Sequence, residues 1–232
     1  MKLFNTFYER NVSECERSIY KLLEKNPKVK VLDLGCWDGD LSIKVAKYIG
    51  TEKVYGVEID PNKVKKAKLK GVKVYKEDLN KKFPFKKNYF DVVIASQVIE
   101  HLYNTDNFVE EIYRVLKPYG YVIISTNNLA SWHNLFALVL GYQPFPSDIS
   151  RYTNIGKLIG LFKGDGKSWS HLRIFTTYSL IDLLKFHKFN INKVVGVGYY
   201  PFPQSLAILL SKLDKIHSAY VTVKATKPGN KK

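Results

Sequence analysis

Short runs rich in Val, Ile and Leu recur along the chain and alternate with helical patterns. The first four runs begin about 18–25 residues apart, as strand–helix–strand units require. Several are almost continuously apolar, which is typical of strands buried on both faces of a parallel sheet. The pattern favours an α/β fold with a mostly parallel, doubly wound sheet. The expected strands are Lys28–Leu34, Lys53–Ile59, Val72–Lys76, Phe90–Ala95, Tyr121–Thr126, Ile191–Val197 and Tyr220–Ala225.

Helices are expected between these strands. Apolar residues from Leu41 to Ile49 repeat at helical spacing. A second apolar stripe covers Phe108–Leu116 and is closed by Pro118, and a third helix is expected over Tyr178–Phe186.

The strand–helix rhythm breaks between residues 127 and 175, where the chain is aromatic, glycine-rich and irregular. A break of this length is more typical of a lid or a substrate-binding segment than of a plain loop. We therefore expect one domain with an insertion. Its parts are an N-terminal helical segment (1–27), a core (28–126), an inserted lid or acceptor segment (127–175) and C-terminal helix and strands (176–226).

The composition adds weaker constraints. The 232 residues carry 37 basic and 21 acidic side chains, a net charge of +16, and only five of the basic residues are arginine. This excess predicts either a polyanionic partner or a solvated lysine surface. No apolar run is long enough to span a membrane, and the chain starts without an apolar signal core. We expect a soluble, cytoplasmic protein, monomeric or homodimeric.

The turn after the first strand is the most informative segment. Glycines there allow a close approach to a ligand, and the following helix N-terminus presents N–H groups. The turn lacks the third glycine of the dinucleotide fingerprint. It carries three carboxylates instead, Asp33, Asp38 and Asp40. They would repel a pyrophosphate but could hold an ammonium or sulfonium group, which favours a cationic nucleoside.

Two more acids follow the next strands. Glu58 closes the second expected strand, where an acid can accept hydrogen bonds from the ribose hydroxyls of an adenosine. Asp78 follows the third and is placed to accept from an adenine amino group, while the N–H of Leu79 could serve a ring nitrogen.

Five segments together resemble a known family: VLDLGCWDGD, VYGVEID, KEDL, FDVVIASQVIEHL and RVLKPYGYVII, in order over about residues 28–126. The chain resembles class I S-adenosylmethionine-dependent methyltransferases, most of all the small-molecule branch of ubiquinone and menaquinone biosynthesis. The resemblance implies a Rossmann-like seven-stranded sheet and S-adenosylmethionine as cofactor. The cofactor-binding residues that it implies are Asp33, Gly35, Cys36, Trp37, Asp38, Gly39, Glu58, Ile59, Asp78, Leu79, Ser96 and Gln97.

One residue departs from the family pattern, because Trp37 stands where the central glycine of the turn is usual. A non-glycine residue fits there if its φ is negative and its side chain points away from the ligand. Alternatively, the indole covers the cofactor or contacts the sulfonium through a cation–π interaction.

The expected activity is methyl transfer to O, N or C of a small, lipophilic or aromatic acceptor. His101 and His171 are candidate general bases, although His101 could instead form a hydrogen bond at a helix start. His133, Tyr142 and Arg173 are candidate acceptor contacts. Neither His nor Cys spacing predicts a metal site. Two alternatives stay open, an RNA methyltransferase, which the charge suits, and a non-catalytic regulatory protein that binds S-adenosylmethionine.

Overall fold

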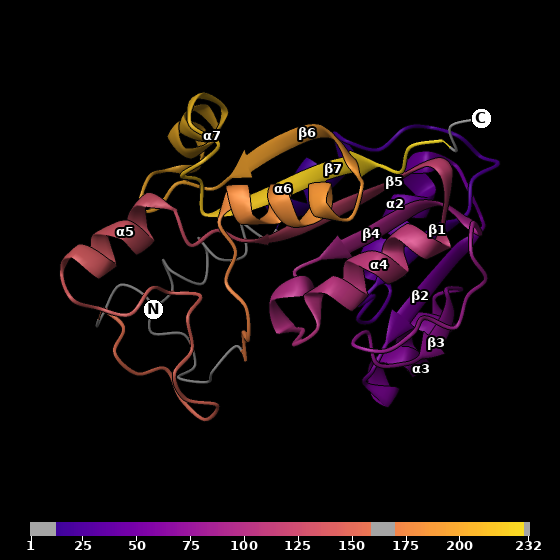
Figure 1. The fold of residues 1–232 in the computed structure, drawn as a ribbon, viewed down its shortest axis with the longest axis horizontal. Helices are drawn as coiled ribbons and strands as arrows, with labels where there is room; N and C mark the ends of the chain where they lie inside the picture. The colour runs from indigo at the N-terminus through magenta and orange to yellow at the C-terminus, as the bar shows by residue number, and fades with distance from the viewer. Residues whose placement is uncertain (1–12, 159–169, 230–232) are drawn as a thin grey trace.

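A seven-stranded sheet forms the centre of the chain in a computed structural model, which describes residues 13–158 and 170–229. The strands run in the order β3-β2-β1-β4-β5-β7-β6 (Figure 1). Those from β1 to β5 pair in parallel, whereas β7 is antiparallel to both of its neighbours. The strands are β1 (Val31–Leu34), β2 (Val54–Glu58), β3 (Lys73–Lys76), β4 (Phe90–Ser96), β5 (Leu116–Asn127), β6 (Asn190–Val197) and β7 (Tyr220–Thr226).

This topology confirms the predicted Rossmann-like, mostly parallel, doubly wound sheet. The strand order reverses between β1 and β4, and ligands of open α/β sheets bind outside the carboxyl ends of the strands at such a switch point. The turns after β1 and β4 are therefore the first place to look for a site.

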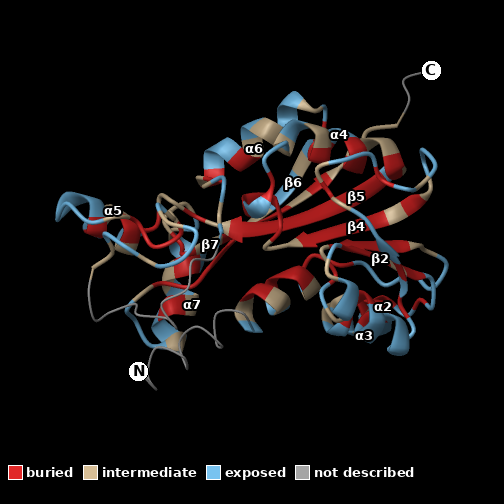
Figure 2. Cartoon of the chain, turned by 90° about the horizontal axis from the view of Figure 1, so that it is seen from below, coloured by how far each residue is buried: buried red, intermediate tan, exposed pale blue. Residues whose placement is uncertain are grey.

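Helices cover both faces of the sheet (Figure 2). Residues 13–20 with α2 and α3 lie on one face, and α4 with α6 lie on the other. The α-helices with assigned bounds are α2 (Asp40–Ile49), α3 (Pro61–Leu69), α4 (Thr105–Val115), α5 (Trp132–Val139), α6 (Thr177–Phe186) and α7 (Gln204–Leu213). A short 3-10 helix, η1, covers Ile99–His101.

Each face of the sheet has its own apolar core. Ile19 and Val45 pack against Ile123 on one face, all of them fully buried. On the other face, Phe108 of α4 and Leu180 of α6 belong to the larger core. The β-strands between these cores are buried on both sides, which explains their nearly continuous apolar sequences.

Local sequence signals set the helix ends. Asp60 caps α3 by accepting from the backbone N–H groups of Asn62 and Lys63, and Pro61 occupies the first helical position. Thr176 and Ser179 form a reciprocal capping box at the start of α6.

The sequence prediction was wrong at three places. The helix expected to reach Leu116 ends at Val115, and β5 begins at Leu116, five residues before the predicted start. Leu116 pairs with Phe90, and a register shift between Phe90 and Val92 accommodates the irregular segment that includes Pro118. The other two differences are the helices α5, in the segment expected to be irregular, and α7, because the sequence analysis predicted neither of them.

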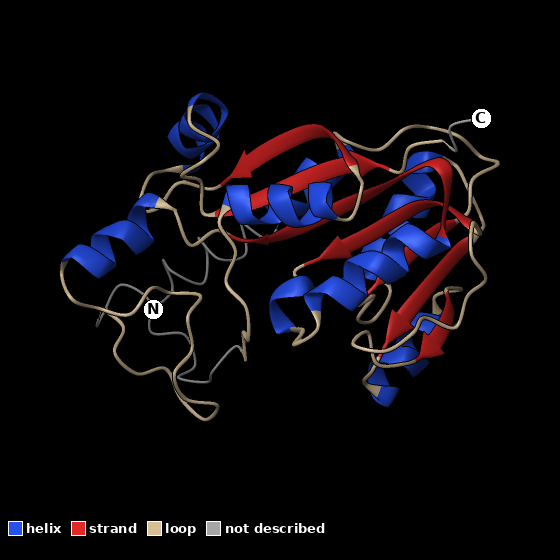
Figure 3. Ribbon diagram, in the orientation of Figure 1, coloured by secondary structure: helices blue, strands red, loops and turns tan. Residues whose placement is uncertain are grey.

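The segment after β5 extends beyond one end of the sheet, and long loops gather there (Figure 3). Its two ends meet at a parallel bridge between Asn128 and Phe175. The segment thus leaves the sheet at the carboxyl end of β5 and returns to the same place before α6. Within the described parts of the chain, no helix has the length and apolarity to cross a membrane.

Candidate active site

The turn from β1 to α2 uses left-handed backbone at three alternate positions. The φ angles are 71° at Gly35, 50° at Trp37 and 86° at Gly39. A Cβ at Gly35 would lie 2.5 Å from Cγ2 of Val98, and one at Gly39 would lie 3.0 Å from Cβ of Ala67. Both glycines are therefore required by the chain's own packing.

The expectation of a negative φ at Trp37 was wrong. Its backbone N–H donates to Oε2 of Glu58 at 3.0 Å, and this bond holds the turn against the end of β2 in the left-handed conformation. The indole is 59% exposed, and Nζ of Lys63 lies 3.6 Å from its ring centroid. One face of the ring therefore already holds a cation.

The acidic turn is less negative than its sequence suggests. Nζ of Lys70 lies 3.0 Å from Oδ2 of Asp38 and 2.5 Å from Oδ1 of Asp40. Two of the three carboxylates thus share a lysine from the end of α3, 30 positions away from Asp40. A cation-binding role for this turn stays a prediction, and Asp33 is the one of its three carboxylates that does not share Lys70.

Asp33 is almost fully buried at the end of β1, and its Oδ2 accepts from Oγ of Ser42 at 2.6 Å. Burial raises the pKa of Asp33 to about 7, although the bond from Ser42 opposes the rise. The carboxyl group is therefore ready to ionise when a cation approaches it.

Glu58 is buried at the end of β2, and its carboxylate is anchored by backbone donors. Oε1 accepts from Ile59 and Asp60 at 2.8 and 2.9 Å, and Oε2 accepts from Trp37. A carboxylate has about four acceptor positions, so about one remains for a ribose hydroxyl.

The next three predicted contact residues, Ile59, Asp78 and Leu79, come after β2 and β3. Ile59 is 62% exposed, whereas Leu79 is buried. Oδ1 of Asp78 accepts from the backbone and side-chain N–H groups of Asn80, so Asp78 does begin a turn.

A cavity of about 640 Å³ opens beside the β1–α2 turn. Its size suits a small-molecule ligand. Seven of the twelve predicted cofactor-binding residues line it, namely Asp33, Gly35, Cys36, Trp37, Asp38, Ser96 and Gln97. Gly39, Glu58, Ile59, Asp78 and Leu79 are not part of this lining.

Both predicted catalytic histidines line the same cavity. The ring centroids of His101 and His171 are 4.8 Å apart. Burial lowers the pKa of His101 and lowers that of His171 to about 4, so both rings are neutral near pH 7. Neutral rings can accept a proton, as a general base must.

Glu100, which follows the fourth strand directly before His101 in the sequence, also lines the cavity and is 1% exposed. Burial raises the pKa of Glu100 to about 7, although the hydrogen bond that Thr126 donates acts to lower it. Asn127 and Tyr220, at the paired ends of β5 and β7, also line the cavity. The position of Asn127 at the carboxyl end of a parallel strand was the signal available in the sequence.

Three more residues line the cavity from the face of the sheet that residues 13–20 and α2 cover, namely Cys15, Glu16 and Lys44. The sequence around them did not indicate a role in the site. Nζ of Lys44 lies 3.1 Å from Oε2 of Glu16. The only described lysine in the cavity lining thus has an acidic partner.

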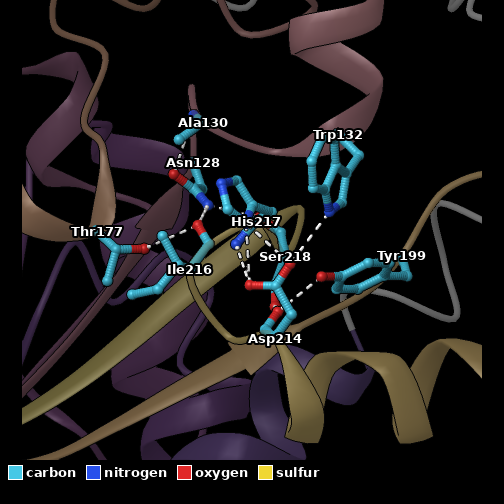
Figure 4. A network of polar contacts seen from close by, with 9 residues as sticks. All are labelled: Asn128, Ala130, Trp132, Thr177, Tyr199, Asp214, Ile216, His217 and Ser218. Atoms are coloured by element: carbon cyan, nitrogen blue, oxygen red, sulfur yellow. Dashed lines mark hydrogen bonds and ion pairs between the residues drawn. The ribbon is translucent and has the colours of Figure 1, made fainter.

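The start of the inserted segment is tied to the loop between α7 and β7 (Figure 4). Asn128 donates to the carbonyls of Ile216 and Ser218, and Nε1 of Trp132 donates to Oδ2 of Asp214 at 3.1 Å. Burial opposes ionisation of Asp214, but hydrogen bonds from Tyr199, His217 and Trp132 lower its pKa to about 2. This network fixes the point at which the inserted segment leaves the sheet and α5 begins.

The three predicted acceptor contacts are not in the cavity lining. The ring of His133 packs 5.5 Å from Phe145 and 5.0 Å from Tyr200, and burial lowers its pKa to about 4. Tyr142 is 38% exposed after α5. Arg173 donates to the carbonyl of Tyr103 at 3.1 Å. His133 therefore packs between the insertion and the segment after β6, and Arg173 joins the return of the insertion to the loop after η1.

Comparison with known proteins adds the family. A family model described as a methyltransferase domain matches residues 25–151, more than half of the chain. The chain belongs to this methyltransferase family. The family and the fold imply S-adenosylmethionine as the cofactor.

Curated relatives lie in the expected branch. The chain is 31% identical over 134 residues to an uncharacterized methyltransferase of Schizosaccharomyces pombe. This alignment covers 53% of this chain and 48% of that protein. It is 29% identical over 164 residues to a demethylmenaquinone methyltransferase of Lactobacillus johnsonii, covering 67% and 64% of the two chains. The chain thus spans about half to two thirds of the length of these relatives.

Solved structures agree on the fold. A chain from the complex of the Haloferax volcanii Trm112 methyltransferase activator aligns with a TM-score of 0.66 at 12% identity, over 97% of this chain and 93% of that chain. A SAM-dependent methyltransferase from Thermotoga maritima aligns with a TM-score of 0.61 at 20% identity, covering 97% and 98%.

Proposed function

We propose that this chain transfers the methyl group of S-adenosylmethionine to an O, N or C atom of a small, lipophilic or aromatic acceptor. The observation that carries the proposal is the cavity of about 640 Å³, in which the family's cofactor turn meets two neutral imidazoles from distant segments. The matched family model and the curated relatives support the same chemistry.

The residues present fit the cofactor. The buried carboxyl of Asp33 would hold the ammonium group, and the remaining acceptor position of Glu58 would take a ribose hydroxyl. Oδ2 of Asp78 and the N–H of Leu79 would serve the adenine, because the Asx turn at Asn80 uses Oδ1 of Asp78. Ser96 and Gln97, at and just after the end of β4, line the cavity on the other side of the switch point.

The bound cofactor supplies an already activated methyl group on a sulfonium. The remaining work of the protein is to align the acceptor and to exclude water, and such positioning can contribute ~7–11 kcal/mol to lowering the barrier. His101 and His171 would remove a proton from an acceptor that is protonated when it attacks. The described part of the inserted segment, 127–158 and 170–175, would cover the acceptor.

The apolar character of the acceptor is inferred from the insertion. Trp132, Phe136 and Val139 are more than half exposed, and their helix α5 lies beyond the carboxyl end of β5 (Figure 1). Large exposed apolar side chains of this kind often mark a surface that binds an apolar partner.

Calorimetry with S-adenosylmethionine and S-adenosylhomocysteine tests the cofactor. We expect both to bind with dissociation constants below about 1 mM, and Asp33→Asn to weaken both. Absence of binding tighter than millimolar by the wild-type chain would overturn the proposed activity.

A labelled-methyl assay tests the acceptor. The folded chain is incubated with labelled S-adenosylmethionine and, in parallel, with a set of alkylated phenols and with total RNA. We expect label in the phenol fraction. Label confined to RNA would exclude a small-molecule acceptor.

A further inference from the structure

One carboxylate and two imidazoles converge on the cavity. Glu100, His101 and His171 each present one side-chain oxygen or nitrogen, and these three atoms all lie within 4.8 Å of one another. All three residues line the cavity beside Asp33 and Gly35. The cluster therefore faces the proposed ligand space and not only the protein interior.

Main-chain bonds hold this cluster together. The backbone N–H groups of Leu172 and Arg173 donate to the carbonyl oxygen of Glu100 at 2.8 and 3.0 Å. They fasten the return of the inserted segment to η1. His171 is consequently fixed next to the pair that follows β4.

The hydrogen bonds of the histidines define their tautomers. Nδ1 of His171 lies 2.9 Å from the carbonyl oxygen of Pro146, which can only accept, so Nδ1 carries the proton and Nε2 the lone pair. Nδ1 of His101 has a similar but longer contact, 3.4 Å, to the carbonyl of Ser170. Histidines that bind metals usually donate their other N–H to a carbonyl or carboxylate in this way.

The carboxylate of Glu100 is buried among neutral donors. Thr126 donates to Oε2 at 2.9 Å, and Asn127 donates to Oε1 at 3.4 Å. With its amide turned to suit its neighbours, Gln97 also donates to Oε1, at 3.2 Å. Among the described residues, no lysine or arginine forms an ion pair with Glu100. A buried carboxylate that is surrounded by neutral donors is suited to binding a cation.

We propose that Glu100, His101 and His171 bind one divalent transition-metal ion at the wall of the cavity. Two imidazoles and one carboxylate are a ligand set found around Zn²⁺ and around other divalent transition metals that keep open positions. Bond lengths of about 2.0–2.2 Å put neighbouring ligand atoms about 3–3.5 Å apart, so small side-chain rotations must close the cluster around the ion.

Three protein ligands leave at least one coordination position for a ligand in the cavity. We extend the proposal to an acceptor that carries an oxygen donor, such as a phenol or hydroxyl, and this extension rests on the proposed function. An ion at this place would orient that oxygen and lower its pKa, and it would activate the acceptor in place of His101 and His171, because coordinated imidazoles cannot also act as bases.

The first experiment measures metal binding without the cofactor. The untagged chain is treated with a chelator, dialysed and titrated by calorimetry with Zn²⁺, Mn²⁺ and Co²⁺, with Mg²⁺ as the oxygen-preferring comparison. We expect one ion per chain for at least one transition metal, bound more tightly than Mg²⁺. Failure of all three to bind tighter than millimolar would overturn the site.

Two variants locate the ion. Glu100→Gln and His171→Asn should each weaken binding by at least about tenfold. His187→Asn is the matched control, because His187 pairs with Asp106 outside the cavity at 2.9 Å. Unchanged binding in both site variants, or an equal loss in His187→Asn, would refute the assignment. Thermal unfolding and S-adenosylhomocysteine binding of each variant report separately on the fold and on the proposed function.

A probe tests the open coordination position. Acetohydroxamate, a small ligand with two oxygen donors, should bind the Zn²⁺-loaded chain at least about tenfold more tightly than the metal-free chain. Equal binding to both forms would refute the oxygen-donor extension, while the metal titration would still stand.

Discussion

The imidazole rings of His101 and His171 lie 4.8 Å apart, although 70 positions separate the two residues in the chain. His101 ends η1, shortly after β4, and His171 lies where the inserted segment returns to the sheet. The carbonyl of Glu100 joins the two places by accepting from Leu172 and Arg173. The candidate active site thus depends on the docking of the insertion as much as on the sheet.

Replacement of Asp33 by asparagine should separate binding from folding. The amide oxygen of the new side chain can still accept from Ser42, so we expect the free energy of unfolding at pH 8 to stay equal or rise. Loss of a charge-assisted bond to the cofactor's ammonium should weaken S-adenosylhomocysteine binding by at least about tenfold. Calorimetry and urea unfolding measure the two effects.

Asp40→Asn is the control for that substitution, because the side chain of Asp40 is 62% exposed and faces Lys70. We expect its cofactor affinity to stay within about threefold of wild type. Equal losses in the two variants would mean that the overall charge of the turn, and not Asp33, determines binding.

Cofactor binding should depend on pH through Asp33. Its pKa of about 7 in the empty chain must fall when an ammonium group binds, so binding releases a proton. Affinity for S-adenosylhomocysteine should therefore fall by about tenfold per pH unit below pH 7 and level off above it. Calorimetry from pH 5.5 to 8.5 measures this, and a wild-type slope retained in Asp33→Asn would contradict it.

Gly35→Ala should destabilise the fold by about 2–4 kcal/mol. The new Cβ would meet Val98 at 2.5 Å, and alanine would also have to adopt a φ of 71°. Gly50→Ala is the matched control, because Gly50 has a φ of 90° but no atom within 4 Å of its added Cβ.

The control should cost only about 1–2 kcal/mol, the backbone penalty alone. Denaturant unfolding of both variants measures the difference. Equal losses at the two glycines would show that Val98 moves aside without cost.

The network around Asp214 should stabilise the chain near neutral pH and should lose this effect in a defined acid range. The pKa of Asp214 is lowered to about 2 from an ordinary value of 3.8, so its contribution is complete above about pH 4. The stabilising contribution of Asp214 should be lost as the pH falls through about 2. The free energy of unfolding of Asp214→Asn should lack this component, and hydrogen exchange should rise at Trp132, whose indole donates to Asp214.

A Trp37→Gly variant should keep its free energy of unfolding within about 1 kcal/mol of wild type. Glycine removes a left-handed backbone cost of roughly 1–2 kcal/mol. It loses roughly 0.5–1 kcal/mol each from chain entropy and from the cation–π contact with Lys63. A loss above about 2 kcal/mol in thermal or urea unfolding would mean that the exposed indole packs more tightly than its exposure indicates.

Most of the fold could be predicted from the sequence, because the parallel strands are buried on both faces and leave apolar runs. Predicted and observed strands agree within a few residues except at β5, where the pairing of Leu116 with Phe90 outweighs the apolar helical stripe. The conformation of Trp37 could not be predicted, because it follows from a hydrogen bond to Glu58, 21 positions away.

The sequence by itself determined the alternation of strands and helices, the family and the position of the cofactor turn. Each of these depends on residues near one another in the chain. Only the tertiary structure decided that Lys70 offsets Asp38 and Asp40, that His133 and Arg173 are not in the cavity lining, and that Glu100 joins His101 and His171. The physical reason is that charge pairing and ligand clustering depend on distances in space, and no spacing along the chain encodes those.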